Sequence, residues 1–126
     1  MVEKFKKILA AIKDGRGGVA VFALMKMDEL TDRWTVVLSA PWAKEGDAEV
    51  FKYILDLIRS NLSPEEISTV ARISIFSQKD HLIELLLKYA SGASISGKIN
   101  GNQIHEGYII ETDPNPEPPP QSKLDL

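Results

Sequence analysis

The stretch from Arg33 to Trp42 constrains the fold of this chain more than any other. Its residues alternate at a period of two, so that Trp34, Val36 and Leu38 fall on one face. Such alternation predicts a β-strand with one buried side. Pro41 has no amide hydrogen to give to a sheet, and it forces the preceding residue into an extended conformation. The strand should therefore end just before the proline.

The segments on either side of this strand have equally clear patterns. Val19 to Met25 contains no polar residue, which predicts a strand covered on both faces and joined to the first by an antiparallel hairpin. Apolar residues at helical spacing between Val50 and Leu62 predict an amphipathic helix with Asp47 as its N-cap. The capping box Ser63-Pro64-Glu65-Glu66 predicts a short helical turn directly afterwards.

The best turn signal in the chain is Asn100-Gly101, which predicts a type I′ hairpin because that turn needs positive φ at both central residues. In this register Ile104, Tyr108 and Ile110 share one face of the hairpin. Glu106 falls on the same apolar face, which predicts a β-bulge there rather than a buried acid. The other expected elements are a helix through residues 5–12, a strand at 70–76, and a helix that the capping pattern Ser77-Gln78-Lys79-Asp80 begins and that runs to about Ala90.

These elements run in the order helix, strand, strand, helix, short helix, strand, helix, strand, strand. Helical crossovers between the middle strands, with hairpins at both ends, imply an α+β domain. We expect a mixed five-stranded sheet packed by three main helices in two or three layers, with the strand order left open. Prolines cluster from residue 112 onwards, which predicts a single domain over 1–111 and a flexible proline-rich tail over 112–126.

Composition argues against several classes of function. The net charge of −3 disfavours a nucleic-acid partner, because domains that bind nucleic acids usually carry a basic face. The absence of cysteine removes disulfides, thiol nucleophiles and thiolate zinc sites. No apolar run is long enough to cross a bilayer, so we expect no membrane partner and a cytoplasmic location.

Residues suited to catalysis are few. His81 and His105 have no spacing that makes them a recognisable set of metal ligands. The glycine-rich loop at 14–18 leads from a helix into a strand, the reverse of a phosphate-binding loop. Ser39 lies outside any nucleophile-elbow motif. We therefore predict no catalytic residue, no metal and no cofactor, while the question of enzyme activity stays open.

Trp42 marks the best position for a small-ligand pocket. It follows a strand end and precedes a helix, and mixed sheets form ligand crevices at such places. Arg33, Arg72 and His105 are the polar side chains whose strand positions could let them contact a ligand there. A small enzyme or ligand-binding domain is thus the alternative function, and core packing is the competing interpretation of Trp42.

The leading prediction is a non-catalytic binding or self-assembly module. The strand at 19–25 has two apolar faces, of which the helices cover one. Either the first helix covers the other face, or a second copy does so in a homodimer. The tail could also attract a protein partner, since Pro116-x-x-Pro119 matches the minimal motif of proline-reading grooves. The residues expected at the homodimer interface are Val19, Val21, Phe22, Leu24 and Val37.

Two hydrophobic motifs carry a resemblance to other proteins. The first is Asp32-x-Trp34-x-Val36-Val37-x-Ser39-Ala40-Pro41-Trp42, and the second is Tyr108-Ile109-Ile110. Together they resemble a family of small uncharacterised prokaryotic α+β proteins. The resemblance implies a shared α+β fold over about residues 19–110. That family has no known activity, so the resemblance brings no catalytic residue with it.

Overall fold

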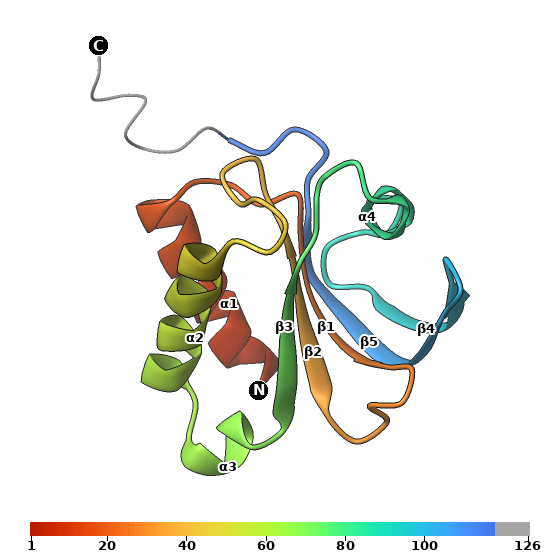
Figure 1. The fold of residues 1–126 in the computed structure, drawn as a ribbon, viewed down its shortest axis with the longest axis horizontal. Helices are drawn as coiled ribbons and strands as arrows, with labels where there is room; N and C mark the ends of the chain where they lie inside the picture. Colours follow the sequence, from red (N-terminus) through yellow and green to blue (C-terminus); the bar gives the residue numbers. More distant parts are fainter. Residues whose placement is uncertain (118–126) are drawn as a thin grey trace.

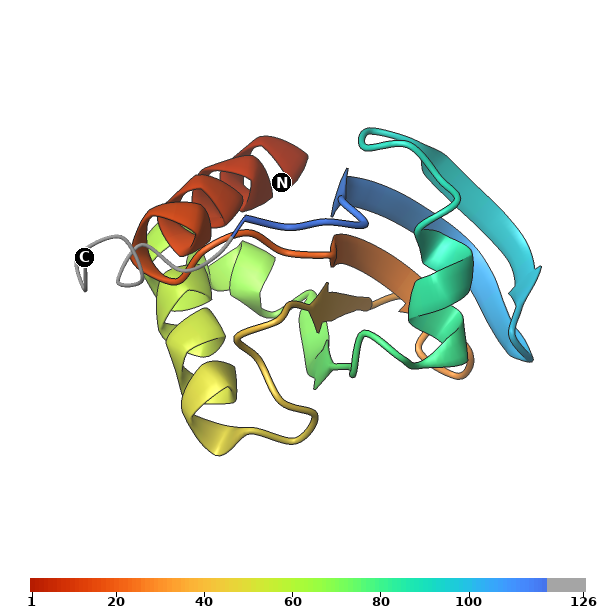
Figure 2. The same cartoon turned by 90° about the horizontal axis from the view of Figure 1, so that it is seen from above.

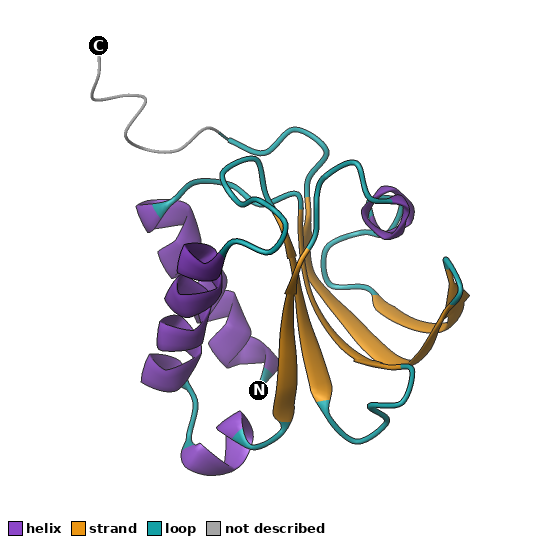
Figure 3. Ribbon diagram, in the orientation of Figure 1, coloured by secondary structure: helices purple, strands orange, loops and turns teal. Residues whose placement is uncertain are grey.

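The computed structural model describes residues 1–117 as a mixed five-stranded sheet with helices packed beside it (Figures 1 and 3). The α+β fold predicted from the sequence is therefore confirmed. The order of elements along the chain also agrees with the prediction. The elements are α1 (Val2–Gly15), β1 (Val21–Met27), β2 (Trp34–Ser39), α2 (Ala48–Asn61), α3 (Pro64–Ile67), β3 (Val70–Ile75), α4 (His81–Leu86), β4 (Ser94–Ile99) and β5 (Asn102–Thr112).

The strand order, which the sequence left open, is β3-β2-β1-β5-β4. β1 lies at the centre and pairs antiparallel with both β2 and β5. β4 pairs antiparallel with β5, and β3 pairs parallel with β2. A parallel pair needs a crossover connection, which α2 and α3 provide. β3 and β4 consequently form the two edges of the sheet.

The two faces of the sheet bury separate hydrophobic cores within one chain. Phe22, Leu24 and neighbouring residues of β2 pack under α1 and α2. The alternate residues, including Val21 and Val37, pack with Leu82 and its neighbours in α4. Figure 2 shows α1 and α2 on one side of the strands and α4 on the other. Helices of this chain thus cover both apolar faces of β1.

This arrangement decides where the five residues expected at a homodimer interface lie. Each of their side chains is at most 1% exposed. Val19, Phe22 and Leu24 belong to the core under α1 and α2, whereas Val21 and Val37 belong to the core with α4. A second copy could reach these side chains only if a helix moved away. Any contact between copies must therefore use another surface.

Local capping signals in the sequence match the structure closely. The Asp47 carboxylate accepts hydrogen bonds from the backbone N–H groups of Glu49 and Val50, and so caps α2. Ser63 and Glu66 form both hydrogen bonds of the predicted capping box. Asn100 and Gly101 have φ values of 51° and 80°, as a type I′ turn requires. These features need only neighbouring residues, which explains the agreement.

The hairpin of β4 and β5 differs from the prediction on one face. The pairing register shifts between Ile104 and Glu106, so the predicted bulge is confirmed. The extra residue reverses the alternation beyond it. As a result Tyr108 and Ile110 face the core under α1 and α2, while Ile104 faces the core with α4. The expectation that these three residues share a face was wrong for this reason.

The chain leaves α4 earlier than its apolar periodicity predicts. The helix ends at Leu86 rather than near Ala90. Beyond it, the Lys88 and Tyr89 N–H groups close tight turns onto the Leu85 and Leu86 carbonyls, and the chain then bonds to β5. The Thr112 hydroxyl donates to the Tyr89 carbonyl, and the Gly92 N–H donates to the Ile109 carbonyl. Bonds to a strand distant in the sequence therefore override the local preference.

The start of the predicted tail belongs to the folded sheet. Thr112 is the last residue of β5, and the Asp113 N–H donates to the Ala20 carbonyl. The Gly18 N–H donates to the Glu117 carbonyl, and a Cβ at Gly18 would lie only 2.6 Å from the Glu117 nitrogen. Residues 118–126, and with them part of the Pro116-x-x-Pro119 motif, lie outside the described residues.

Candidate functional site

Trp42 joins the loop before β1 to α2. Its indole N–H donates to the Gly18 carbonyl oxygen at 2.9 Å, and its ring meets the Tyr53 ring edge-on with centroids 6.5 Å apart. The Arg16 guanidinium lies 4.6 Å from the centre of the Tyr53 ring. Burial raises the pKa of the Tyr53 hydroxyl, and the nearby Arg16 charge partly opposes that rise. The indole N–H of Trp42 is thus used in a hydrogen bond and its ring in packing against Tyr53.

The polar residues expected near Trp42 lie elsewhere. Arg33 is exposed and precedes β2, whereas Trp42 follows the other end of that strand. Six residues of extended strand separate the two ends by about 20 Å. His105 lies at the bulge in β5, with its Nε2 atom 2.7 Å from the Asp28 carbonyl oxygen. The structure therefore does not gather Trp42, Arg33 and His105 around one pocket.

Arg72 is the predicted site residue that lies on an edge strand. β3 is the edge strand, and within residues 1–117 no backbone hydrogen bond reaches its outer side. The Phe76 N–H donates to the Leu38 carbonyl of β2. Backbone groups of successive strand residues point to opposite sides, so Ile73 and Ile75 direct their N–H and C=O groups outward. Such an edge can accept another strand.

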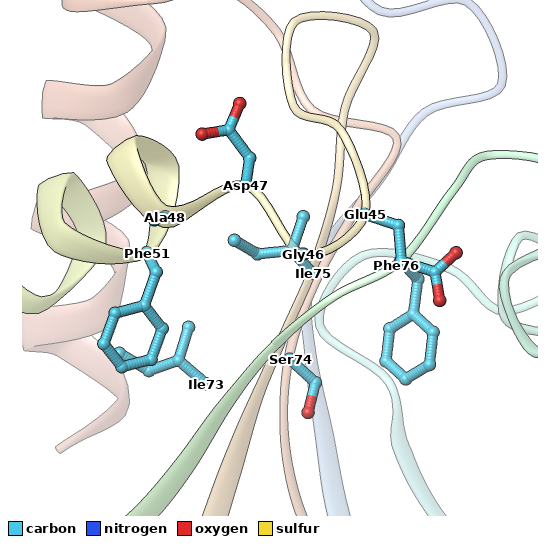
Figure 4. A pocket seen from close by; sticks show the side chains of 9 residues that line it. All are labelled: Glu45, Gly46, Asp47, Ala48, Phe51, Ile73, Ser74, Ile75 and Phe76. Carbon is cyan, nitrogen blue, oxygen red and sulfur yellow. The ribbon is translucent and has the colours of Figure 1, made fainter.

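An apolar groove runs beside this edge, between β3 and α2 (Figure 4). Two hollows lie along it, and Phe51 and Ile73 line both. The first, which we name the Glu45 hollow, has a volume of about 420 Å³ and is bounded by residues 45–48 and 73–76. The second, the Leu55 hollow, has a volume of about 240 Å³ and is bounded by Leu55 and residues 70–73.

Phe51 supplies the groove with an exposed aromatic side chain. Its side chain is 42% exposed, and Tyr89 is the other large apolar residue that is more than a third exposed in the described part of the chain. Figure 4 shows the Phe51 ring lying against Ile73, on the side of β3 that faces α2. Ser74 and Phe76 point to the opposite side of the strand. Exposed aromatic side chains beside a hollow are frequent anchors of protein interfaces.

The two ends of the β3 edge carry opposite charge. Glu45 and Asp47 line the Glu45 hollow, and Arg72 lines the Leu55 hollow. The Arg72 Nε–H donates to the Thr35 hydroxyl at 3.3 Å, and its Nη1 atom lies 3.8 Å from the Glu29 carboxylate. The Glu29 side chain is 75% exposed, so this ion pair is loose and well screened. The positive charge of Arg72 is thus only weakly neutralised within the chain and stays available at the edge.

Contacts of Glu66, just before β3 in the chain, fix where this strand begins. Lys4 of α1 forms an ion pair with Glu66, which also accepts the Ser63 backbone N–H. The Lys4 hydrogen bond, followed by the Ser63 backbone bond, lowers the pKa of Glu66 to about 2. The chain then passes to Thr69, whose carbonyl accepts the Trp34 N–H of β2. This chain of contacts holds β3 in register with β2.

Phe51 and Leu55 were missed as site residues because the helical pattern of α2 is broad. Val50, Ile54 and Ile58 form the buried row of this helix. Phe51 and Leu55 form a second row beside it, one residue further along. The apolar pattern of the sequence also assigned this second row to the core. The width of the apolar stripe was the available signal. Its meaning depended on β3 being an edge strand, which the sequence did not reveal.

Other kinds of site were sought over the described residues. In residues 1–117, no three His, Asp or Glu side chains gather as possible metal ligands. No helix in that part of the chain is long and apolar enough to cross a membrane. No protein-family model, curated protein or solved structure matches the chain, so the resemblance to small prokaryotic α+β proteins stays a prediction.

Proposed function

We propose that this domain is a non-catalytic binding module that takes up an extended protein segment along the free side of β3. The observation that carries the proposal is the combination of an unpaired edge with an apolar groove beside it. Strand addition uses backbone hydrogen bonds for affinity and pockets for alternate side chains for specificity. The β3 groove offers both.

The order of the two hollows along β3 suits an added strand. Alternate side chains of a strand lie about 7 Å apart on one face. The Glu45 hollow and the Leu55 hollow follow one another along β3, with Phe51 and Ile73 between them. An added strand with apolar residues at positions i and i+2 could fill both hollows. Its backbone would bond to the outward groups of Ile73 and Ile75.

Charge restricts the segment further. Glu45 and Asp47 make the first hollow acidic, and Arg72 adds positive charge near the second. The preferred segment therefore has a basic residue toward the Glu45 hollow and an acidic residue toward Arg72. This pattern separates the preferred ligand from a purely hydrophobic strand.

A displayed library of random linear peptides tests the proposal. We expect selection on the intact protein to enrich peptides with apolar residues at i and i+2. Phe51→Lys should weaken their binding at least about tenfold, since it removes a central aromatic anchor. Tyr89→Lys is the matched control, because Tyr89 is similarly exposed at 37% but does not line the β3 groove.

The result that overturns the proposal is equally clear. Peptides that bind Phe51→Lys as tightly as the unmodified protein would place the docking surface elsewhere. Loss of binding in Tyr89→Lys but not in Phe51→Lys would do the same. Circular dichroism of both variants shows whether each keeps its fold, so unfolding cannot imitate either result.

A further inference from the structure

The free side of β3 is complementary to itself. Resting on the proposed function, we infer that the segment added to β3 is β3 of a second copy of this chain. The two copies form a two-fold homodimer in which their sheets become continuous. The chain thus supplies its own ligand strand, and the dimer uses the open edge instead of the buried faces of β1.

The backbone of β3 selects one register for this pairing. The pairing with β2 shifts at Ala71, so the regular part of the edge runs from Arg72 to Phe76 and is centred on Ser74. A two-fold axis at Ser74 places Ile73 opposite Ile75 of the second copy. The same pairing occurs twice by symmetry, and each pair exchanges two backbone hydrogen bonds. The outward groups of both isoleucines are then satisfied.

Two neighbouring registers are less favourable. An axis at Arg72 would set the two Arg72 side chains directly opposite each other, and like charges opposite one another destabilise a sheet. An axis at Ile73 would set Ile75 opposite Ala71, where the strand is irregular. An axis at Ser74 meets neither problem, because two small hydroxyl side chains then face each other at the centre.

The charges of the edge also agree with this register. The axis at Ser74 sets Arg72 opposite Phe76 of the second copy. Glu45 lies beside Phe76 and lines the same hollow (Figure 4). Arg72 of each copy therefore meets Glu45 of the other, which gives two symmetric ion pairs. Within its own chain Arg72 donates through Nε to the Thr35 hydroxyl, and its Nη1 atom has only a loose contact with Glu29. That loose contact is what Arg72 gives up when its Nη atoms turn to the second copy.

The apolar groove gains cover from the same arrangement. Phe51 packs beside Ile73, and Ile73 would lie opposite Ile75 of the second copy. Phe51 is thereby brought toward the Glu45 hollow of that copy, which Ile75 lines. The symmetric partner does the same in return. The exposed ring of Phe51, at 42%, then becomes part of an apolar contact across the two-fold axis.

A cysteine cross-link tests the register directly. The Ser74 pair would be a non-hydrogen-bonded pair with a Cα–Cα distance of about 4.5 Å, which lies within the range of disulfides. The chain has no cysteine of its own, so Ser74→Cys introduces the only thiol. We expect diamide to convert this variant almost fully into a covalent dimer. Ser94→Cys, on the opposite edge strand β4, should form little covalent dimer under the same conditions.

Charge reversal tests the ion pairs independently. Sedimentation velocity should show a dimer of the unmodified protein at micromolar concentration. Arg72→Glu and Glu45→Arg should each weaken the dimer at least about tenfold, and the double variant should recover most of the loss. Recovery by Glu29→Arg instead of Glu45→Arg would show that Arg72 acts only within its own chain, and would overturn the inference.

The outcomes also separate this inference from the proposed function. A protein that stays monomeric at all concentrations, with no Ser74→Cys cross-link, excludes the second copy as the ligand. If library peptides still bind in a Phe51-dependent manner, the proposed function stands and only the inference fails. If neither a dimer nor Phe51-dependent peptide binding is observed, both fail together.

Discussion

The two edges of the sheet are built differently. β3 is regular from Arg72 onward, and an apolar groove lies beside it. β4 carries Gly97 at a φ of 106° and an exposed lysine, Lys98, and its register with β5 shifts at the β5 bulge. Bulges and charged side chains, lysines above all, are features by which natural sheets prevent edge pairing. The chain therefore protects one edge and leaves the other open, a difference that supports the proposed use of the open edge.

The hollow near β4 supports this contrast. It has a volume of about 310 Å³ and lies where α4 meets the end of the hairpin. Lys88 and Lys98 both line it, so an approaching strand would meet two cations. The β3 groove instead has an apolar centre with opposite charges at its ends. The hollows thus differ in the charge that they would present to an approaching strand.

The largest expected effect concerns the protected edge. A Cβ at Gly107 would lie 2.6 Å from the Ile95 Cγ1 atom, inside the contact between β5 and β4. Gly107→Ala should therefore reduce the free energy of unfolding by about 1–3 kcal/mol through overpacking. Chemical denaturation measures this loss, and Ser96→Ala on exposed β4 surface is the control. An unchanged stability would show that β4 does not depend on this close approach.

The next largest effect, on self-association, is expected when a lysine is introduced into the β3 edge or removed from the β4 edge. Ser74→Lys gives β3 a charge like that of Lys98 on β4, and places like charges at the proposed two-fold axis. We expect association to weaken at least about tenfold, or about 1.4 kcal/mol, without loss of fold. Lys98→Thr should have the opposite effect and promote self-association through β4. Light scattering at matched concentrations compares the two, and equal behaviour would remove the distinction between the edges.

A smaller effect is expected in β2, beneath the open edge. Ser39 is fully buried, and its hydroxyl has no hydrogen-bond partner among residues 1–117. Ser39→Ala should raise the free energy of unfolding by up to about 1 kcal/mol, because it removes an unsatisfied polar group. Thr35→Val should instead lower it, since the Thr35 hydroxyl accepts the Arg72 Nε–H bond next to the edge. Thermal unfolding distinguishes the two signs.

The smallest effect concerns the contacts of Glu66 that set the start of β3. The pKa of Glu66 is about 2 in the folded chain against 4.5 for an unperturbed glutamate. The ionised carboxylate therefore stabilises the fold fully above pH 4.5, and this contribution is lost as the pH falls toward 2. Glu66→Gln should be less stable than the unmodified protein near neutral pH, and the difference should shrink across that window. A constant difference would exclude the ion pair with Lys4 as its cause.

Local features of this protein were predictable from residues close together in the chain. Asp47 caps α2, and Asn100-Gly101 turns the hairpin, as their side chains and φ preferences dictate. The candidate site was harder to predict from the sequence. Arg72 was among the expected binding residues, but its importance at the edge follows from the position of β3. Trp42 stood out in the sequence and is used in packing against Tyr53.

The sequence by itself determined the α+β composition, the order of elements and most of their caps, because periodicity and capping act over a few residues. Only the tertiary structure decided that α4 covers Val21 and Val37, that the bulge reverses the faces of β5, and that β3 ends the sheet. Strand order depends on hydrogen bonds between segments far apart in the chain, and many pairings satisfy the same local pattern. The open edge, and with it the candidate binding surface, therefore exists only in the folded molecule.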